Sequence, residues 1–386
     1  MIYARNILQK GTITRFYTTI TNKISTENIT KKTIKRPPFY KVFPKKKFIS
    51  KILFELGSDH TYGKLYPIYE SIYDNLDGPD VKIKVPPEIK ANAMMLMKKT
   101  LERVRFKTKA INKHLLALEN EILDKAAEMG DDDAISLLAF EVLKCPEENT
   151  KEDVEYAKKL IEHLYKVKKH PLTTKLAGDL ALKNKDYDKA LSFYKQFLSK
   201  ENDTYLAGTV YEQIGKLYFQ TTNLSEAENN FLKAIKYSPI EQVVQSYFYL
   251  SQLYTNSDPQ KSKKYLEFCA SQGFKESFKL LGFLEMNYFG DLIKAREWFG
   301  LGMEVFDLEC YVGYFDCCWR LKSWEKCWHC YSSIKKLAAT NERAKTLLHN
   351  FELYRRDTIT ELNTIVSREG IDHDNKVLLD RNGRWN

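Results

Sequence analysis

The sequence predicts an all-α protein, a right-handed superhelical solenoid built from helical hairpins. The first observation is a periodicity, because small residues followed by a second helical pattern recur 31 to 39 residues apart, at Ala139, Gly178, Gly215, Ser251, Gly282 and Gly313. The second is that apolar residues make up 43% of the chain without an apolar run long enough to cross a bilayer. Repeats of this length bury their apolar faces against each other, which favours one stacked array over several independent domains.

Residues 211–239 carry the most complete repeat, YEQIGKLYFQTTNLSEAENNFLKAIKYSP. Small residues at Gly215 and Ala227 allow two antiparallel helices to cross closely, and the large residue Phe231 fills the adjoining space. Pro239 ends the second helix. These offsets are those of a tetratricopeptide repeat.

The neighbouring segments follow the same pattern. Gly178 and Tyr194 lie 37 residues before Gly215 and Phe231, and residues 269–302 have the small-residue lead-in and AREWF ending of the shorter Sel1-like variant. Six hairpins are therefore expected over residues 114–347.

Four cysteines crowd into residues 317–330, CCWRLKSWEKCWHC. Alignment of the repeats puts Cys327 where Ala190, Ala227 and Ala295 stand, which predicts a small residue at a helix crossing. Adjacent Cys317 and Cys318 point about 100° apart on a helix, so the four thiols do not make a tetrahedral zinc site. The C-x-x-C pair lies inside a helix and not at the strand-to-helix junction typical of redox motifs.

No catalytic, cofactor-binding or metal-ligating residue is predicted. The phosphate-loop, dinucleotide-binding, zinc-protease and serine-hydrolase motifs are all missing from the chain, so an enzyme is not expected.

The net charge of +10 is unevenly distributed. Residues 1–36 hold eight Lys or Arg against one acid, whereas residues 114–386 hold 37 basic against 42 acidic residues. The cationic, Thr- and Ser-rich residues 1–36 are typical of a mitochondrial targeting presequence. The acidic body argues against nucleic acid as a ligand of the repeats.

Residues 37–113 form a basic helical segment in which lysines alternate with aromatic residues. This pattern suits an anionic membrane surface or RNA, with a solvated arm folded against the first repeat as the alternative. The predicted membrane-contacting residues are Lys41, Phe43, Lys45, Lys46, Lys47, Phe48 and Lys51.

Three stretches resemble a known family: VFPKKKFISKILFELGSDHTYGKLYPIYE, HLLALENEILDKAAEMGDDDAISLLAF and residues 269–318. They are similar to the fungal mitochondrial tetratricopeptide proteins required to export the C-terminal tail of cytochrome c oxidase subunit 2. The resemblance implies a peripheral protein on the matrix side of the inner membrane that works with an Oxa-type insertase on this subunit. It brings no catalytic residue or cofactor.

The first helices of stacked hairpins line the concave face of such a superhelix, which predicts a peptide groove. Its residues are Lys175, Asp179, Lys183, Glu212, Lys216, Phe219, Phe248, Gln252, Lys279 and Phe283. The leading hypothesis is an adaptor that holds a polypeptide for translocation. An RNA-binding or translation factor is the alternative, and residues 348–386 are expected to end a helix and continue as a disordered polar tail.

Overall fold

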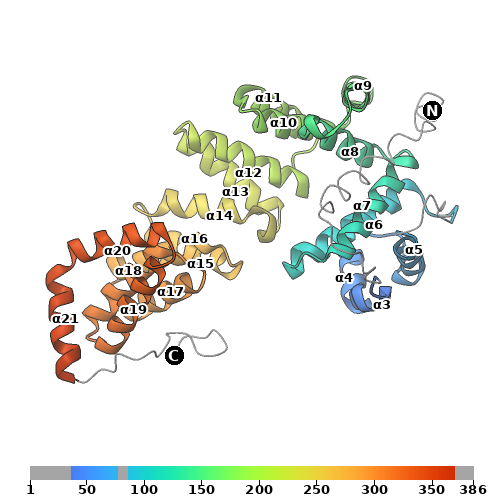
Figure 1. Ribbon diagram of the computed structural model, residues 1–386. Helices are drawn as coiled ribbons and strands as arrows, with labels where there is room; N and C mark the ends of the chain where they lie inside the picture. Colours follow the sequence, from blue (N-terminus) through green and yellow to red (C-terminus); the bar gives the residue numbers. More distant parts are fainter. Residues whose placement is uncertain (1–35, 77–85, 370–386) are drawn as a thin grey trace. The chain divides into compact units, whose positions relative to one another are not determined.

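The computed structural model describes residues 36–76 and 86–369, and within these ranges the chain is helical without a strand (Figure 1). The all-α prediction is confirmed. The predicted presequence, apart from Arg36, and residues 370–386 of the predicted tail lie outside the described residues. The chain divides into two compact units, residues 1–202 and 203–386.

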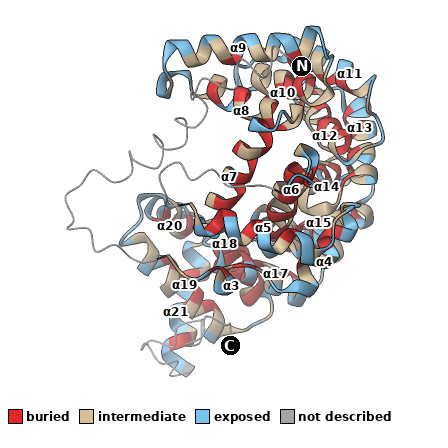
Figure 2. Cartoon of the chain, turned by 90° about the vertical axis from the view of Figure 1, so that its right-hand side faces the viewer, coloured by how far each residue is buried: buried red, intermediate tan, exposed pale blue. Residues whose placement is uncertain are grey.

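The first unit begins with helices that pack around one core. In Figure 2, α7 is red and tan along most of its length, so few of its residues are exposed. The elements are α3 (Phe39–Val42), α4 (Lys46–Glu55), α5 (Tyr62–Asp74), α6 (Ala91–Thr108) and α7 (Lys113–Glu128). Their shared cluster of buried side chains runs from Phe39 to Ala134.

The described residues of this segment, 37–76 and 86–113, are therefore part of a folded domain and not an arm lying on the first repeat. Its aromatic side chains are fixed by hydrogen bonds, because Tyr69 donates to the carbonyl of Met97 (2.9 Å) and Tyr73 to that of Pro37 (2.9 Å). The boundary expected at residue 113 falls at the start of α7, whose Leu118 and Ile122 are fully buried in this core. Residues 125–130, KAAEMG, have the small-residue lead-in of a repeat, and for this reason α7 was assigned to the solenoid.

Six helical hairpins follow at the predicted places. The first unit holds α8 (Asp132–Lys144) with α9 (Lys151–Lys166) and α10 (Pro171–Lys183) with α11 (Tyr187–Leu198). The second holds α12 (Tyr205–Gln220) with α13 (Leu224–Tyr237), α14 (Ile240–Tyr254) with α15 (Pro259–Ser271), α16 (Lys275–Leu284) with α17 (Leu292–Glu304), and α18 (Leu308–Arg320) with α19 (Trp324–Ala338). A 3₁₀ turn, Pro146–Glu148, and a π-helical turn, Glu285–Phe289, complete two of the connections.

Each close crossing depends on a glycine facing an aromatic ring. A Cβ atom added to Gly178 would come within 2.6 Å of the Tyr194 ring, and one added to Gly215 within 2.6 Å of the Phe231 ring. Gly282 is as close to Phe299, at 2.5 Å. The predicted pairing of small and large residues is confirmed in these three hairpins.

Polar side chains start the second helix of most hairpins. Asp186, Asn223, Asp258 and Asp291 each accept a hydrogen bond from a backbone N–H of the first turn that follows. These N-caps satisfy donors that have no partner inside the helix, and so fix where the second helix begins.

Two further helices follow the sixth hairpin, α20 (Glu342–Tyr354) and α21 (Arg356–Glu369). The boundary expected at residue 347 falls inside α20. Phe351 and Leu362 are buried against the last hairpin, so the chain remains packed through residues that were expected to lie beyond the repeats.

The core of the first unit contains one poorly satisfied carboxylate, Asp124 on α7. It is 8% exposed, and its Oδ1 has no hydrogen-bond partner among the described residues. Burial, with smaller contributions from the nearby carboxylates of Glu121 and Glu128 that Lys125 opposes, raises the pKa of Asp124 to about 8. The folded state thus holds a proton that the unfolded chain releases near pH 4.

We predict that the free energy of unfolding falls as pH rises from about 4 to 8, because the unfolded state binds fewer protons than the folded state over this window. Asp124→Asn removes the titrating carboxyl group, so the free energy of unfolding should depend less on pH. Urea unfolding at pH 5 to 8 measures this dependence. Glu155→Gln, a change to an exposed carboxylate in the same unit, is the control. A wild-type slope unchanged by Asp124→Asn would show that Asp124 is charged in the fold.

Candidate functional site

The predicted groove residues of the first unit lie together on α10, but their charges are already paired. Lys175 Nζ contacts the Asp179 carboxylate at 2.5 Å, and the other oxygen of that carboxylate accepts a hydrogen bond from the Tyr194 hydroxyl (2.8 Å). Lys183 donates to the backbone carbonyl of Lys144 at the end of α8. Asp179 therefore joins the two helices of its hairpin, and Lys183 joins two consecutive first helices.

In the second unit, Glu212 departs from the prediction. It is 6% exposed, and one carboxylate oxygen pairs with Lys216 at 2.8 Å. The other accepts hydrogen bonds from the backbone N–H (3.3 Å) and the hydroxyl (3.0 Å) of Ser246 on α14. Glu212 is a buried link between α12 and α14, and the expectation that it faces a ligand is wrong.

The kink in α14 gives Glu212 this role. Val243 has non-helical backbone angles (φ −120°, ψ 29°), which interrupts the helix three residues before Ser246. A carboxylate from the neighbouring hairpin supplies the acceptor that an N-cap side chain normally provides for an N–H in a first turn. Repeat alignment cannot detect this arrangement, because it arises from contact between two hairpins.

The remaining groove candidates are of two kinds. Phe219, Phe248 and Phe283 pack against neighbouring rings, with centroids 4.9 Å from Tyr249, 5.0 Å from Phe274 and 5.0 Å from Phe299, respectively. Lys279 pairs with Glu309 of α18 at 3.1 Å, whereas Gln252 is exposed on α14. These first-helix surfaces thus present half-buried aromatic edges, internally paired charges and a free amide.

The basic segment near the N-terminus is only partly as predicted. Lys41, Lys45, Lys46, Lys47 and Lys51 are all exposed. Phe43, however, is 7% exposed with its ring 4.9 Å from that of Tyr69, and Phe48 is half-buried against the same core. The expectation that Phe43 contacts a membrane is corrected, because its side chain is needed inside the domain.

Two other aromatic residues are exposed where Phe43 is not. Phe54 is 87% and Tyr40 is 68% exposed. On α4, Lys47, Lys51 and Phe54 are spaced four and three residues apart and so share one side, opposite the buried Ile49 and Ile52. The helical phase of residues 46–55 would have identified Phe54 as the aromatic residue exposed beside Lys47 and Lys51. The alternation of lysine with aromatic residues did not identify it.

The cysteine-rich segment forms the core of the last hairpin. Cys317, Cys318, Cys327 and Cys330 are free thiols that are fully buried, and Cys330 Sγ lies 3.2 Å from the carbonyl oxygen of Tyr311. Burial raises the pKa of Cys317 and of Cys318 to about 12, so both thiols are protonated at neutral pH. Within residues 36–76 and 86–369, no group of side chains is arranged to hold a metal ion.

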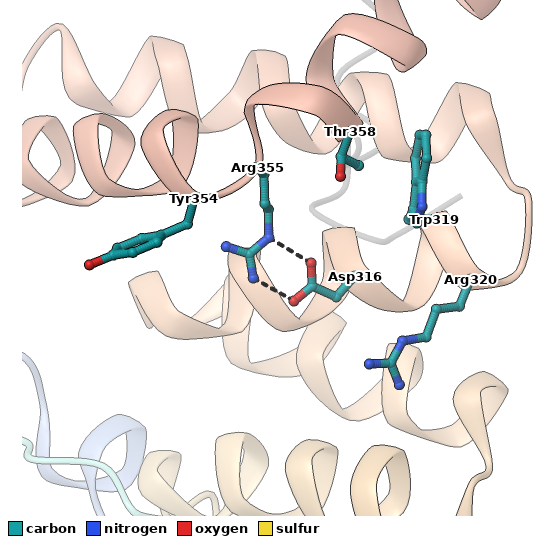
Figure 3. Close-up of a pocket in the computed structure, with 6 residues that line it drawn as sticks. All are labelled: Asp316, Trp319, Arg320, Tyr354, Arg355 and Thr358. Atoms are coloured by element: carbon teal, nitrogen blue, oxygen red, sulfur yellow. Dashed lines mark hydrogen bonds and ion pairs between the residues drawn. The ribbon is translucent and has the colours of Figure 1, made fainter.

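A shallow pocket of about 360 Å³ lies between the end of α18 and the α20–α21 junction (Figure 3). Arg355 forms a two-point ion pair with Asp316, with N–O distances of 2.8 and 2.7 Å. Trp319, Arg320, Tyr354 and Thr358 complete the lining. The pair ties α21 to the last hairpin, a role that no motif in the sequence indicated.

The comparison with known proteins separates the two parts of the chain. Residues 35–131 match the family described as MSS2 N-terminal domain, which coincides with the buried cluster from Phe39 to Ala134. Residues 208–241 match the tetratricopeptide repeat, over α12 and α13. Protein MSS2, mitochondrial, from Saccharomyces cerevisiae strain S288c, is 41% identical over 339 residues, which cover 85% of this chain and 96% of that protein. This chain belongs to the MSS2 family.

Two solved structures are similar to this MSS2 family member. PilW, a type IV pilus biogenesis factor, has 19% identity and a TM-score of 0.41, covering 57% of this chain and 99% of PilW. A tetratricopeptide repeat protein from Parabacteroides merdae has 15% identity and a TM-score of 0.33, covering 75% of this chain and 99% of its own.

Similarity across nearly the full length of the yeast protein includes the N-terminal domain and the divergent last repeats. The helices described here include none long and apolar enough to span a membrane. The surfaces predicted for binding are the first helices of the hairpins and the exposed lysines of residues 41–51.

We predict that Glu212→Ala lowers the free energy of unfolding by about 1 to 3 kcal/mol, because it leaves the buried N–H of Ser246 without an acceptor. Glu212→Gln should cost less, since its amide oxygen can still accept this bond. Gln252→Ala, an exposed change on α14, should stay within about 0.5 kcal/mol of wild type. Equal stabilities of the Glu212→Ala and Gln252→Ala variants in urea unfolding would contradict the linking role.

Proposed function

We propose that this chain is a non-enzymatic adaptor on the matrix side of the mitochondrial inner membrane. In this proposal it assists export of the C-terminal tail of cytochrome c oxidase subunit 2, and hence assembly of the oxidase. An Oxa-type insertase is the proposed partner in the membrane. The observation that carries the proposal is the 41% identity to yeast Protein MSS2 over 96% of that protein's length.

Membership of the MSS2 family implies a mitochondrial protein with a function related to cytochrome c oxidase subunit 2. The cationic composition of residues 1–36 supports mitochondrial targeting independently, because it is read from this chain alone. Export of the tail and the side of the membrane are the finer parts of the proposal.

The first-helix surfaces support binding of a peptide segment. Their charges are largely paired with each other, as in Lys175 with Asp179 and Lys279 with Glu309, so a ligand does not meet a field of one sign. Aromatic edges at Phe219 and Phe248 offer apolar contacts, and the exposed Gln252 offers hydrogen bonds. Such a surface suits a polar segment with a few apolar anchors better than a wholly apolar membrane helix.

The exposed lysines of residues 41–51, on α3 and α4 and between them, support contact with an anionic membrane. Five exposed lysines lie within eleven residues, and each contributes about 1 kcal/mol near an anionic leaflet. Phe54 is the aromatic residue placed to enter the interface beside Lys47 and Lys51. Attachment of this kind is reversible and depends on salt.

We predict that this chain restores subunit 2 tail export in budding yeast lacking MSS2. In mitoplasts, added protease should cleave the tail in rescued cells and spare it in the deletion strain, because the untranslocated tail stays in the matrix. Pulse labelling should show equal synthesis of subunit 2 in both strains. Loss of subunit 2 synthesis in the deletion strain, restored by this chain, would favour the RNA-binding or translation alternative.

We predict that glutamine at Lys41, Lys45, Lys46, Lys47 and Lys51 releases the chain from inner-membrane vesicles to the soluble fraction. A matched control replaces five exposed lysines of the same unit, Lys151, Lys158, Lys159, Lys185 and Lys195, and should sediment like wild type. Phe54→Ser should weaken retention with no change in charge. Unchanged sedimentation of the first variant would point to a protein receptor in place of lipid.

A further inference from the structure

The feature that the proposed function leaves unexplained is Phe306, between α17 and α18. Its backbone is left-handed (φ 60°), a conformation that L-residues with a Cβ adopt at a steric cost. The other described residues with positive φ are glycine, lysine or threonine: Gly57, Gly130, Gly273, Gly290, Lys109, Lys169, Lys185, Lys322 and Thr222. Phe306 is the aromatic exception within that set.

The backbone at Phe306 needs no aromatic side chain. Its N–H donates to the carbonyl of Met303 (3.0 Å), and the next N–H, of Asp307, donates to that of Gly302 (3.0 Å). The same pair of bonds ends α15, where Gly273 occupies the left-handed position, and α7, where Gly130 does. This helix C-terminal motif is most stable with glycine.

The side chain of Phe306 does not compensate by packing. It is 73% exposed, and Val305 (42%) and Leu301 (40%), one turn before it on α17, are exposed as well. The three residues form an apolar tip at the end of the helix. A large apolar residue that is both strained and solvated destabilises the fold, which suggests a role in binding.

The charges beside the tip are acidic. Glu304 precedes it and is exposed, and Asp307 and Glu309 follow it at the start of α18. Asp307 caps α18 through the N–H of Glu309, and Lys279, 3.1 Å from Glu309, offsets part of the charge of both Glu309 and Asp307. The surroundings therefore repel an anionic membrane and attract a cation.

We propose that the Phe306 tip, composed of Leu301, Val305 and Phe306 with Glu304, Asp307 and Glu309, docks a cationic amphipathic segment of a partner protein. Apolar side chains of the partner cover Phe306, and its lysines or arginines meet the three carboxylates. This site shares only Glu309 with the first-helix surfaces proposed for the subunit 2 tail, and the proposal does not rest on that function.

The test uses the full chain and a fluorescein-labelled probe peptide, LKKLLKLLKKLLKL, with fluorescence anisotropy as the readout. Phe306→Gly should weaken binding about tenfold while the midpoint of thermal unfolding rises, because glycine relieves the left-handed strain. Thr222→Gly relieves the same kind of strain at another turn, so it should raise the midpoint and leave binding unchanged. This opposite response of stability and affinity separates a binding role from a structural one.

Charge is tested in the same assay. Glu304→Lys should also weaken binding of the lysine peptide, and the glutamate counterpart, LEELLELLEELLEL, should bind wild type at least about tenfold more weakly. Equal affinity of wild type and Phe306→Gly for the lysine peptide would overturn the proposal. Loss of binding to anionic phospholipid vesicles in Phe306→Gly would overturn it in favour of a membrane contact.

Discussion

The close crossing of two helices at a glycine or other small residue is the contact on which the repeats depend. Gly178, Gly215 and Gly282 each lie against an aromatic ring with no room for a Cβ atom. This contact sets the angle within a hairpin, and through it decides which side chains of the first helix point away from the second. The cysteines of the last hairpin follow from the same demand, because Cys327 is a small, fully buried residue in the position that alanine holds in three others.

Polar links join consecutive hairpins beside their apolar contacts, and they account for much of the charge on the first helices. Glu212 accepts hydrogen bonds from Ser246 on the kinked α14, and Lys279 pairs with Glu309 on the next first helix. Arg355, at the α20–α21 junction, pairs with Asp316 on α18. Removing one partner of such a half-buried pair destabilises the fold by more than the intact pair stabilises it, because the other charge is left without a partner. These side chains therefore belong to the architecture, and the proposed peptide ligand would contact what they leave exposed, chiefly the half-buried aromatic rings and Gln252.

The sequence predicted most of the fold, because a repeat states the same packing rule several times. All six small-residue marks lie on the first helix of a hairpin, from Ala139 on α8 to Gly313 on α18. The N-terminal domain was harder to delimit, since Phe43 and α7 have no repeated counterpart and their burial depends on contacts distant in sequence. The offset from Gly215 placed Glu212 on a ligand face, because the contact that buries it comes from the next hairpin, whereas helical phase could have placed Phe54 on the exposed side of α4. Phe306 was invisible to pattern analysis, because a left-handed backbone is a property of the folded turn.

We propose above that the first helices of the repeats hold the subunit 2 tail. The most direct measurement is photo-crosslinking in respiring mitochondria, with a photoreactive amino acid at Gln252 on the first helix α14 or at Leu232 on the second helix α13. Both positions are exposed, so neither change disturbs a core. We expect the residue 252 probe to capture the C-terminal tail of cytochrome c oxidase subunit 2. The residue 232 probe should not capture it. Capture from residue 232 alone, or from neither position, would contradict it.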